Sequence, residues 1–222
     1  MNLVAPHSFD LSPAEAVALQ KALAAQVITR DDFDPAAVRT VAGIDVSLAD
    51  GGRCAIVVLR YPDLTPVETV SASAPLAFPY IPGLLSFRET PLVLAALRRL
   101  SAAPDLLMVD GQGWAHPRRF GIACHVGVLT GLPSIGVAKS VLCGKHEPVG
   151  DEPGDGQPLV HRGETIGTAL RSKARTNPLI ISVGHRISLP TAVSFVQACL
   201  RGYRLPEPTR RAHNAARAKA GE

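Results

Sequence analysis

The chain of 222 residues is poor in cysteine, and its four cysteines are widely separated. They are Cys54, Cys124, Cys143 and Cys199, and no C-x-x-C pair occurs. This pattern argues against a disulfide framework and against a zinc knuckle, whereas free thiols are typical of a reducing compartment. We therefore expect a cytoplasmic protein.

Long apolar segments are also missing. A membrane-spanning helix needs a run of about 18 apolar residues, and the sequence has none. The first residues lack the basic and then apolar segments of a signal peptide. The formal net charge of +4 is small, so it is compatible with a polyanionic partner without requiring one. We expect no membrane contact and a monomer.

The hydrophobic fraction of 46% is high enough for a chain of this length to bury its own core. The length suits one domain, so we predict a single domain over residues 1–222. Within it, residues 1–35 should form an N-terminal helix and a linker. Residues 214–222 are rich in Ala, Arg and Lys, and we expect them to fray.

Three β-rich runs lie near the start of the chain, at 40–48, 54–60 and 67–74. The turn sequences Asp50-Gly51-Gly52 and Tyr61-Pro62-Asp63-Leu64 separate them, which indicates antiparallel hairpins. A helix should precede these runs. Ser12 and Glu15 fit a capping box, and the helix is predicted to reach about residue 28.

Helices and strands alternate through the rest of the chain. This order favours an α/β fold with a mixed sheet, three antiparallel strands followed by parallel ones, and helices on both faces. Residues 144–165 are rich in Gly, Pro and charge and are predicted to be a surface excursion. Helices are expected at 86–100, 118–130 and 191–200, and strands at 106–110, 134–139, 166–170 and 179–183.

Two aspartates stand in apolar strands. Asp45 interrupts Val41–Val46, and an unpaired carboxylate in a central strand costs several kcal/mol. It is either a solvent-facing residue of an edge strand or a metal ligand or catalytic acid. Asp110 ends the strand 106–110, where open α/β sheets place their sites, although Asp-Gly is also a common turn.

Glu89 lies near the start of the next predicted helix. It fits a capping box with Ser86, but Thr90 could instead be the N-cap, with Pro91 as the first helical residue. Two carboxylates on neighbouring strands and one on a packed helix can converge on one point. Carboxylates and water suit Mg²⁺ or Mn²⁺, ions that bind phosphate oxygens and activate water.

Basic, glycine-rich and aromatic segments could contact a nucleic acid. Lys139 closes a strand, where it is either solvated or placed to neutralise a phosphate. The backbone at Gly111, Gly113 and Gly144 could approach a flat base. Tyr80, between two prolines in the loop 78–83, could pack in the core or act as a wedge in a base stack.

Two other classes of site fit poorly. A dinucleotide fingerprint would need a third glycine where His116 stands, and it would need an acidic residue in 131–140, which has none. The spacings of His116, His125 and His185 match no zinc pattern, so we interpret them as polar contacts. His213, taken alone, would be solvent-exposed.

Many segments resemble those of endonuclease V, the deoxyinosine-directed nuclease. The most specific are Tyr80-Ile81-Pro82-Gly83, Phe87-Arg88-Glu89 and the PEPTR run at 206–210. Matching segments extend over roughly residues 40–213. The others are Gly43–Val46, Val109–Gly113, His116–Arg119, Ile135–Lys139, Leu142–Lys145, Arg171–Arg175 and Gly184–Arg186.

This resemblance implies a ribonuclease H-like fold and an activity on damaged DNA. The implied reaction is hydrolysis of the second phosphodiester bond 3′ to deoxyinosine, with Mg²⁺ or Mn²⁺ as cofactor. It implies that Asp45, Asp110, Glu89 and His213 hold the metal; some relatives carry Asp at the last position. It places Lys139 at the scissile phosphate and Tyr80 as the wedge, and it lines the lesion-base pocket with Gly83, Gly111, His116, Leu142 and Gly144.

Three functions remain open from the sequence. The first is a DNA repair endonuclease, and the second is a ribonuclease acting on inosine-containing RNA. The third is a non-catalytic nucleic-acid-binding protein on the same fold. The expected partner is damaged DNA, with single-stranded nucleic acid or RNA as alternatives. The acids Asp45, Glu89 and Asp110 count against the third, because uncompensated carboxylates beside phosphate would weaken binding.

Overall fold

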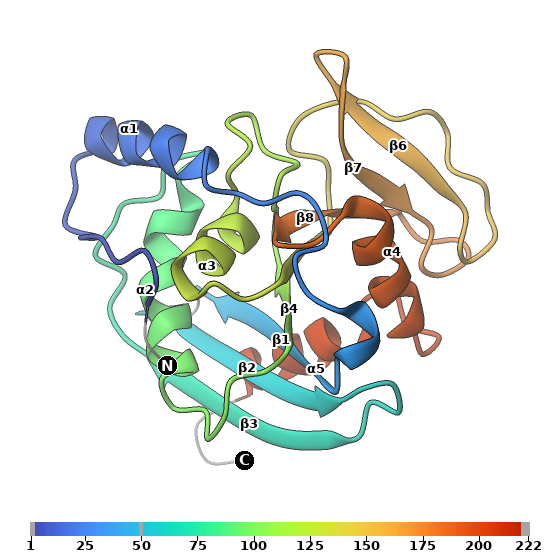
Figure 1. Cartoon of the computed structure of the whole chain (residues 1–222), viewed down its shortest axis with the longest axis horizontal. Coiled ribbons are helices and arrows are strands. Elements are labelled where there is room, and N and C mark those ends of the chain that lie inside the picture. The colour runs from blue at the N-terminus through green and yellow to red at the C-terminus, as the bar shows by residue number, and fades with distance from the viewer. Residues whose placement is uncertain (1–2, 49–50, 219–222) are drawn as a thin grey trace.

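One eight-stranded sheet runs through the protein and carries helices on both faces (Figure 1). The computed structural model describes residues 3–48 and 51–218. The strand order is β3-β2-β1-β4-β5-β8-β7-β6. The strands are β1 (Thr40–Ser47), β2 (Arg53–Arg60), β3 (Pro66–Ser73), β4 (Leu106–Asp110), β5 (Ser134–Ala138), β6 (Gly156–His161), β7 (Glu164–Leu170) and β8 (Leu179–His185).

The sheet is mixed, as the order of elements predicted. β1, β2 and β3 form an antiparallel meander, and β4 and β5 then add parallel strands beside β1. β8 returns antiparallel to β5, and β7 and β6 continue antiparallel to the edge. Parallel pairing is thus confined to the centre, where the carboxyl ends of β1 and β4 meet at one edge of the sheet.

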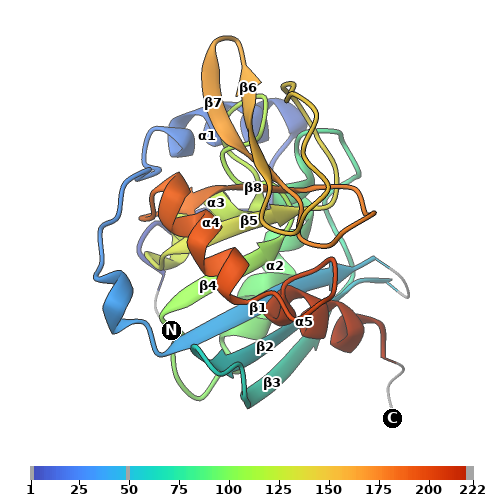
Figure 2. The same ribbon diagram turned by 90° about the vertical axis from the view of Figure 1, so that its right-hand side faces the viewer.

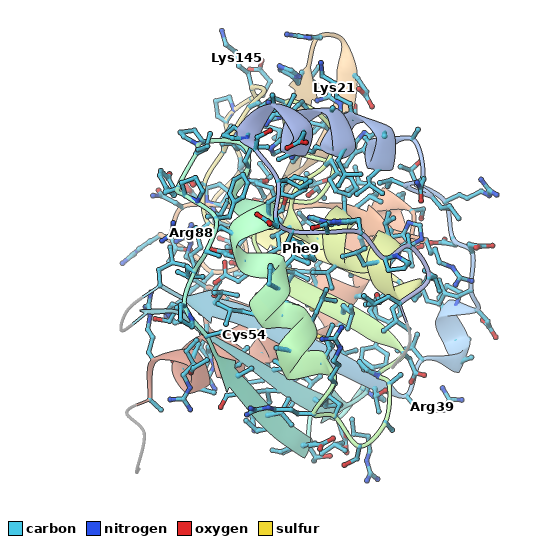
Figure 3. The ribbon with its side chains drawn as sticks, turned by 90° about the vertical axis from the view of Figure 1, so that its left-hand side faces the viewer. Phe9, Lys21, Arg39, Cys54, Arg88 and Lys145 are labelled. Atoms are coloured by element: carbon cyan, nitrogen blue, oxygen red, sulfur yellow. The ribbon has the colours of Figure 1, made fainter. Side chains whose placement is uncertain are left out.

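Alternate side chains of the central strands face different helices. Ala42 and Ile44 pack in the cluster formed with α2 (Leu85–Leu97) and α3 (Ile122–Thr130). Figure 3 shows these two helices in front of the sheet. Val41 and Met108 pack on the other face, with residues of α4 and α5. Figure 2 shows the two helices lying across that face. They are α4 (Leu189–Ala198) and α5 (Glu207–Arg217).

The first turn of α5 lies directly on β1. A Cβ atom built on Gly43 would stand 1.9 Å from the carbonyl oxygen of Pro208, so only glycine allows this approach. The contact fixes the height of α5 above the sheet. Consequently His213, further along the same helix, reaches the end of β1.

The N-terminal helix α1 (Pro13–Ala24) begins with the predicted capping box of Ser12 and Glu15 but ends before residue 28. The chain turns there because Ile28 pairs with the end of β8: its N–H donates to His185 Nδ1, and its carbonyl accepts from the Arg186 N–H. A short 3₁₀ helix, Pro35–Ala37, follows in the linker. α1 packs through Ala16 and Leu23 on the outer side of α2 and α3.

Both predicted starts of α2 are wrong. The helix begins at Leu85 without a side-chain cap, so neither Ser86 nor Thr90 is the N-cap, and Pro91 lies inside the helix. The hydroxyls of Ser86 and Thr90 are buried and have no hydrogen-bond partner among the described residues. The helix α3 starts at Ile122 rather than 118, because Arg119 has a positive φ of 56° and Gly121 is extended.

The expected surface excursion at 144–165 contains strand β6. Its proline, Pro158, is tolerated because β6 is the edge strand of the sheet. α5 continues to Arg217, past residue 214, from which we expected fraying. Asp50 of the predicted turn, the first two residues and the tail at 219–222 lie outside the described residues. No helix within 3–48 and 51–218 has the length and apolar character to cross a membrane.

Candidate active site

Asp45 and Asp110 emerge side by side from parallel strands. Ile44 of β1 is in register with Val109 of β4, so the two following aspartates project from the same face at the carboxyl ends. Asp45 is only 7% exposed. It is therefore not the solvent-facing residue of an edge strand, and β1 lies inside the sheet, between β2 and β4.

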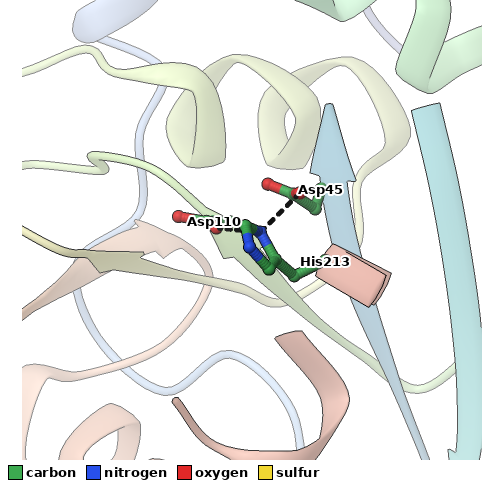
Figure 4. A group of neighbouring side chains, drawn as sticks. All are labelled: Asp45, Asp110 and His213. Atoms are coloured by element: carbon green, nitrogen blue, oxygen red, sulfur yellow. Dashed lines mark hydrogen bonds and ion pairs between the residues drawn. The ribbon is translucent and has the colours of Figure 1, made fainter. Parts of the chain in front are cut away.

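His213 of α5 lies between the two carboxylates (Figure 4). Its Nδ1 is 3.0 Å from Asp45 Oδ2 and 3.9 Å from Asp110 Oδ2. The guanidinium of Arg217, one turn further along α5, contacts the other ring nitrogen, Nε2. A guanidinium only donates, so Nε2 accepts, and Nδ1 carries the proton that it donates to Asp45.

The imidazole of His213 is held neutral. Burial lowers its pKa first, and the nearby cations of Lys139 and Arg217 lower it further, whereas Asp110 raises it. Lys139 forms an ion pair with Asp110, and its Nζ lies 3.5 Å from His213 Nδ1. The lysine predicted to meet a phosphate is therefore at the acidic cluster.

Glu89 approaches the same region from α2, which packs on the face of the sheet opposite to α5. It is 7% exposed, and its pKa is raised to about 8, first by burial and then by the charges of Asp45 and Asp110. The pKa of Asp110 is raised by burial and by Asp45, although Lys139 opposes that shift. Three carboxyl groups thus share a space in which they repel one another.

The donor set fits a divalent cation. A carboxylate oxygen of Asp45, one of Asp110 and a ring nitrogen of His213 all lie within 4.8 Å of one another. Oxygen donors suit Mg²⁺ and Mn²⁺, and the repulsion among buried carboxylates is what a bound cation would relieve. Glu89 is outside this group of three, but the charges of both aspartates raise its pKa, and it lines the same cleft.

A cleft of about 380 Å³ opens beside the acids. Tyr80 is 65% exposed at its rim, which excludes a core position for this residue. The cleft is large enough to accept one planar heterocycle. Its lining includes the three acids, Lys139, Tyr80, Gly83, Gly111, Gln112, His116, Phe120, Leu142 and Arg217.

Comparison with known proteins identifies the family. The family model of endonuclease V matches residues 21–214. An endonuclease V of Trichormus variabilis is 52% identical over 213 residues, with 95% of this chain and 96% of the relative covered. The chain belongs to the endonuclease V family. It is therefore a nuclease.

Solved structures of endonuclease V share the fold. The enzyme of Streptomyces avermitilis is 42% identical with a TM-score of 0.89, covering 96% of this chain and 94% of that one. An endonuclease V of Ciona intestinalis, solved with a 23mer DNA containing an inosine followed by a ribo-adenosine, is 29% identical. Its TM-score is 0.82, and the match covers 93% of this chain and 97% of that one.

Two glycines expected at the base pocket lie elsewhere in the structure. Gly113 is buried against strand β8, where an added Cβ would stand 2.1 Å from the carbonyl oxygen of Val183. Gly144 lines a separate hollow of about 670 Å³ beside β6. Both glycines allow close backbone packing instead of lining the cleft. Gly83, Gly111, His116 and Leu142 do line it.

His116 has no ring nitrogen free to contact a base. Its Nδ1 accepts the backbone N–H of Arg118 at 3.1 Å, so Nε2 carries the proton and donates to the carbonyl of Gly83 at 3.2 Å. Burial, followed by the charge of Arg118, lowers its pKa to about 4. The residue is thus a neutral part of the wall of the cleft.

The sequence did not point to Arg217, Gln112 and Phe120 as residues of the cleft. Arg217 was assigned to a fraying tail, although its i,i+4 spacing from His213 would place both on one face if the helix continued. Gln112 lies between two glycines, and our prediction for this segment rested on those glycines alone. Its Nε2 donates to the Ser140 carbonyl at 2.8 Å, and its Oε1 has no partner among the described residues.

Proposed function

We propose that this nuclease repairs DNA by cutting beside deaminated adenine. The substrate is deoxyinosine in DNA, and the reaction hydrolyses the second phosphodiester bond 3′ to the lesion, leaving a 3′-OH and a 5′-phosphate. The observation that carries the proposal is the convergence of Asp45, Asp110, Glu89 and Lys139 beside a base-sized cleft. Relatives that bind inosine-containing DNA support it.

The cation would be held by Asp45, Asp110 and His213, with Glu89 completing the acidic cluster, and Mg²⁺ is proposed, with Mn²⁺ as a substitute. When bound, it would supply polarisation of a phosphate oxygen and activation of water. The protein's own share is to keep the two aspartates in register and to fix the imidazole between them. Asp45 and Arg217 contact the two ring nitrogens. Coordination through Nδ1 would replace the hydrogen bond to Asp45, and the ring proton would move to Nε2 in place of the contact with Arg217.

Lys139 supplies a positive charge at the phosphate. Its ammonium is bound to Asp110, its side chain is 37% exposed, and it lines the cleft. Water adds to phosphorus while the bond from phosphorus to the 3′-oxygen breaks, and negative charge grows on the non-bridging oxygens. An ammonium fixed beside them stabilises that charge.

The cleft would hold the extruded base. Hypoxanthine presents O6 and N1–H where adenine has an amino group and a bare nitrogen. Gly83 and Gly111 line the cleft with positive φ angles that favour glycine. The Gly83 carbonyl and the Gly111 N–H are bonded within the protein, so the Gly83 N–H and the Gly111 carbonyl are the groups proposed to meet that edge. Tyr80 at the rim would fill the space that the base leaves in the stack.

A ribonuclease acting on inosine in RNA is the second candidate. The Ciona complexes place a ribo-adenosine after the inosine, so a relative accepts a ribonucleotide next to the lesion. A non-catalytic role does not fit, because the chain belongs to a nuclease family and retains its buried acids. The protein is proposed to act as a monomer in the cytoplasm.

A nicking assay tests the proposal. Labelled oligonucleotides of one sequence are compared as duplex DNA with deoxyinosine, duplex DNA with adenine, and RNA with inosine, each with Mg²⁺ and with chelator. We expect a single cut at the second phosphodiester 3′ to deoxyinosine, in Mg²⁺ only. Faster cutting of the RNA would favour the second candidate, and equal cutting of the adenine control would overturn lesion recognition.

A further inference from the structure

Three side chains converge on one backbone oxygen at the wall of the cleft. The carbonyl of Gly83 accepts from Gln20 Nε2 at 3.0 Å, from Arg118 Nη2 at 2.6 Å and from His116 Nε2 at 3.2 Å. A carbonyl oxygen has two lone pairs, so three donors exceed its usual share. Gly83 ends the loop 78–83 that presents Tyr80, which makes this oxygen an anchor for the loop.

Gln20 is the only one of the three donors that comes from α1. It is fully buried, and every polar atom of its amide has a partner. Its Nε2 donates both to Gly83 and, at 2.8 Å, to the carbonyl of Phe120, while its Oε1 accepts from Arg118 Nε. Gly83 and Phe120 both line the cleft, so Gln20 joins two parts of its wall from behind.

The other end of the loop is also held. Arg88 of α2, labelled in Figure 3, donates from Nη1 to the Phe78 carbonyl at 2.9 Å. Inside the loop, the Leu84 N–H closes a turn on the Ile81 carbonyl at 2.9 Å. Tyr80 therefore stands exposed at the apex of a segment fixed at both ends.

We propose that Gln20 is a positioning residue for extrusion of the damaged base. It fixes the angle at which the loop presents Tyr80, and it does so through Gly83 without touching the substrate. This role rests on the proposed function, in which Tyr80 parts the base stack. A loop held in one conformation spends no binding energy on ordering itself when DNA arrives.

The role predicts a selective defect. Extrusion is needed when inosine is paired in a duplex, whereas the base in a single strand is already accessible. Gln20→Met keeps the volume but removes both donors and the acceptor. We expect the ratio of kcat/KM on duplex to kcat/KM on single strand to fall about fivefold, the change that one net hydrogen bond supports.

Leu23→Ala is the matched control. Leu23 is also buried on α1 and packs against Phe120 but takes no part in the bonds to Gly83. It should lower Tm at least as much as Gln20→Met while leaving the duplex to single-strand ratio unchanged. If Leu23→Ala reproduces the change in ratio, or if Gln20→Met slows both substrates equally, Gln20 serves only the stability of α1.

Amide hydrogen exchange of the peptide spanning residues 78–87 tests the anchor without substrate. Exchange should be faster in Gln20→Met and unaltered in Leu23→Ala, and equal exchange in the wild type and Gln20→Met would overturn the inference. Gln20→Glu is a second variant. It keeps an acceptor for Arg118 but loses both donors, so it should share the faster exchange.

A wild type that cuts neither inosine substrate would refute the proposed function, whereas the exchange result still decides the role of Gln20.

Discussion

Replacing Glu89 by glutamine should stabilise the protein in a chelating buffer, by an amount that grows with pH. Burial and the charges of Asp45 and Asp110 raise the pKa of Glu89 from 4.5 to about 8. The pKa of Glu89 is higher in the folded than in the unfolded protein, so binding of its proton favours the folded state. This contribution to the free energy of unfolding is fully present below pH 4.5 and is lost as the pH rises through about 8.

The size of the effect follows from the two pKa values. At pH 7 the unfolded carboxyl ionises freely, whereas the folded one, only 7% exposed, keeps its proton. Glutamine avoids this difference, so Glu89→Gln should raise the free energy of unfolding by about 3 kcal/mol at pH 7, an order-of-magnitude figure. For a chain of this length that is roughly 6–12 °C in Tm. At pH 4.5 the gain should nearly vanish.

The assay is thermal unfolding in chelator, followed by circular dichroism between pH 4.5 and 8.5. Glu147→Gln is the control, because Glu147 is exposed; it should shift Tm little at any pH. The reasoning would be refuted if the Glu89→Gln protein were less stable than wild type, or if its gain in Tm did not change with pH. Either result would mean that burial and like charges do not raise the pKa of Glu89. Added Mg²⁺ should raise Tm more for wild type than for the variant, since the cation stabilises the ionised form.

Three further substitutions test the site. Asp110→Asn should reduce nicking at least about 10³-fold while leaving the Kd for deoxyinosine DNA within a few-fold, as measured by fluorescence anisotropy; wild-type cutting rates would exclude Asp110 from the reaction. Lys139→Met should lower kcat about 10²-fold with little change in KM, because its charge acts where charge develops; a change confined to KM would make it only a binding residue. His213→Asp should shift the ratio of activity in Mg²⁺ to that in Mn²⁺ toward Mg²⁺ by about tenfold, because oxygen donors suit the harder ion; an unchanged ratio would remove His213 from the metal site.

Much of the fold and the acidic cluster could be predicted from local sequence. Asp45 was recognisable because burying a carboxylate in an apolar strand is costly unless it has a partner or a function. Asp110 was recognisable because it ends a buried strand. The structure shows why they meet: parallel pairing of β1 with β4 brings them into register. The order of strands and helices favoured a mixed sheet with helices on both faces, and that fold prediction is confirmed. It did not specify which strands pair.

The remaining features depend on contacts that no short window of sequence contains. Gln20 finds its partners 63 and 100 residues away, so its amide looks like an ordinary polar position of a helix. Arg217 was missed because an Ala- and Arg-rich end has little apolar periodicity, while packing of α5 on β1 keeps it helical. Gly113 and Gly144 were assigned to the pocket because glycine is needed wherever the backbone comes close to another group. The sequence does not show whether that group is a ligand or, as here, another part of the protein.

The claim on which the account depends is that Asp45 and Asp110, with His213, hold a divalent cation. Crystals soaked in Mn²⁺ and measured at its absorption edge would test it directly. We predict an anomalous difference peak within about 2.5 Å of a carboxylate oxygen from each aspartate. A strong peak elsewhere with none between these two residues, at Mn²⁺ concentrations that support nicking, would contradict it.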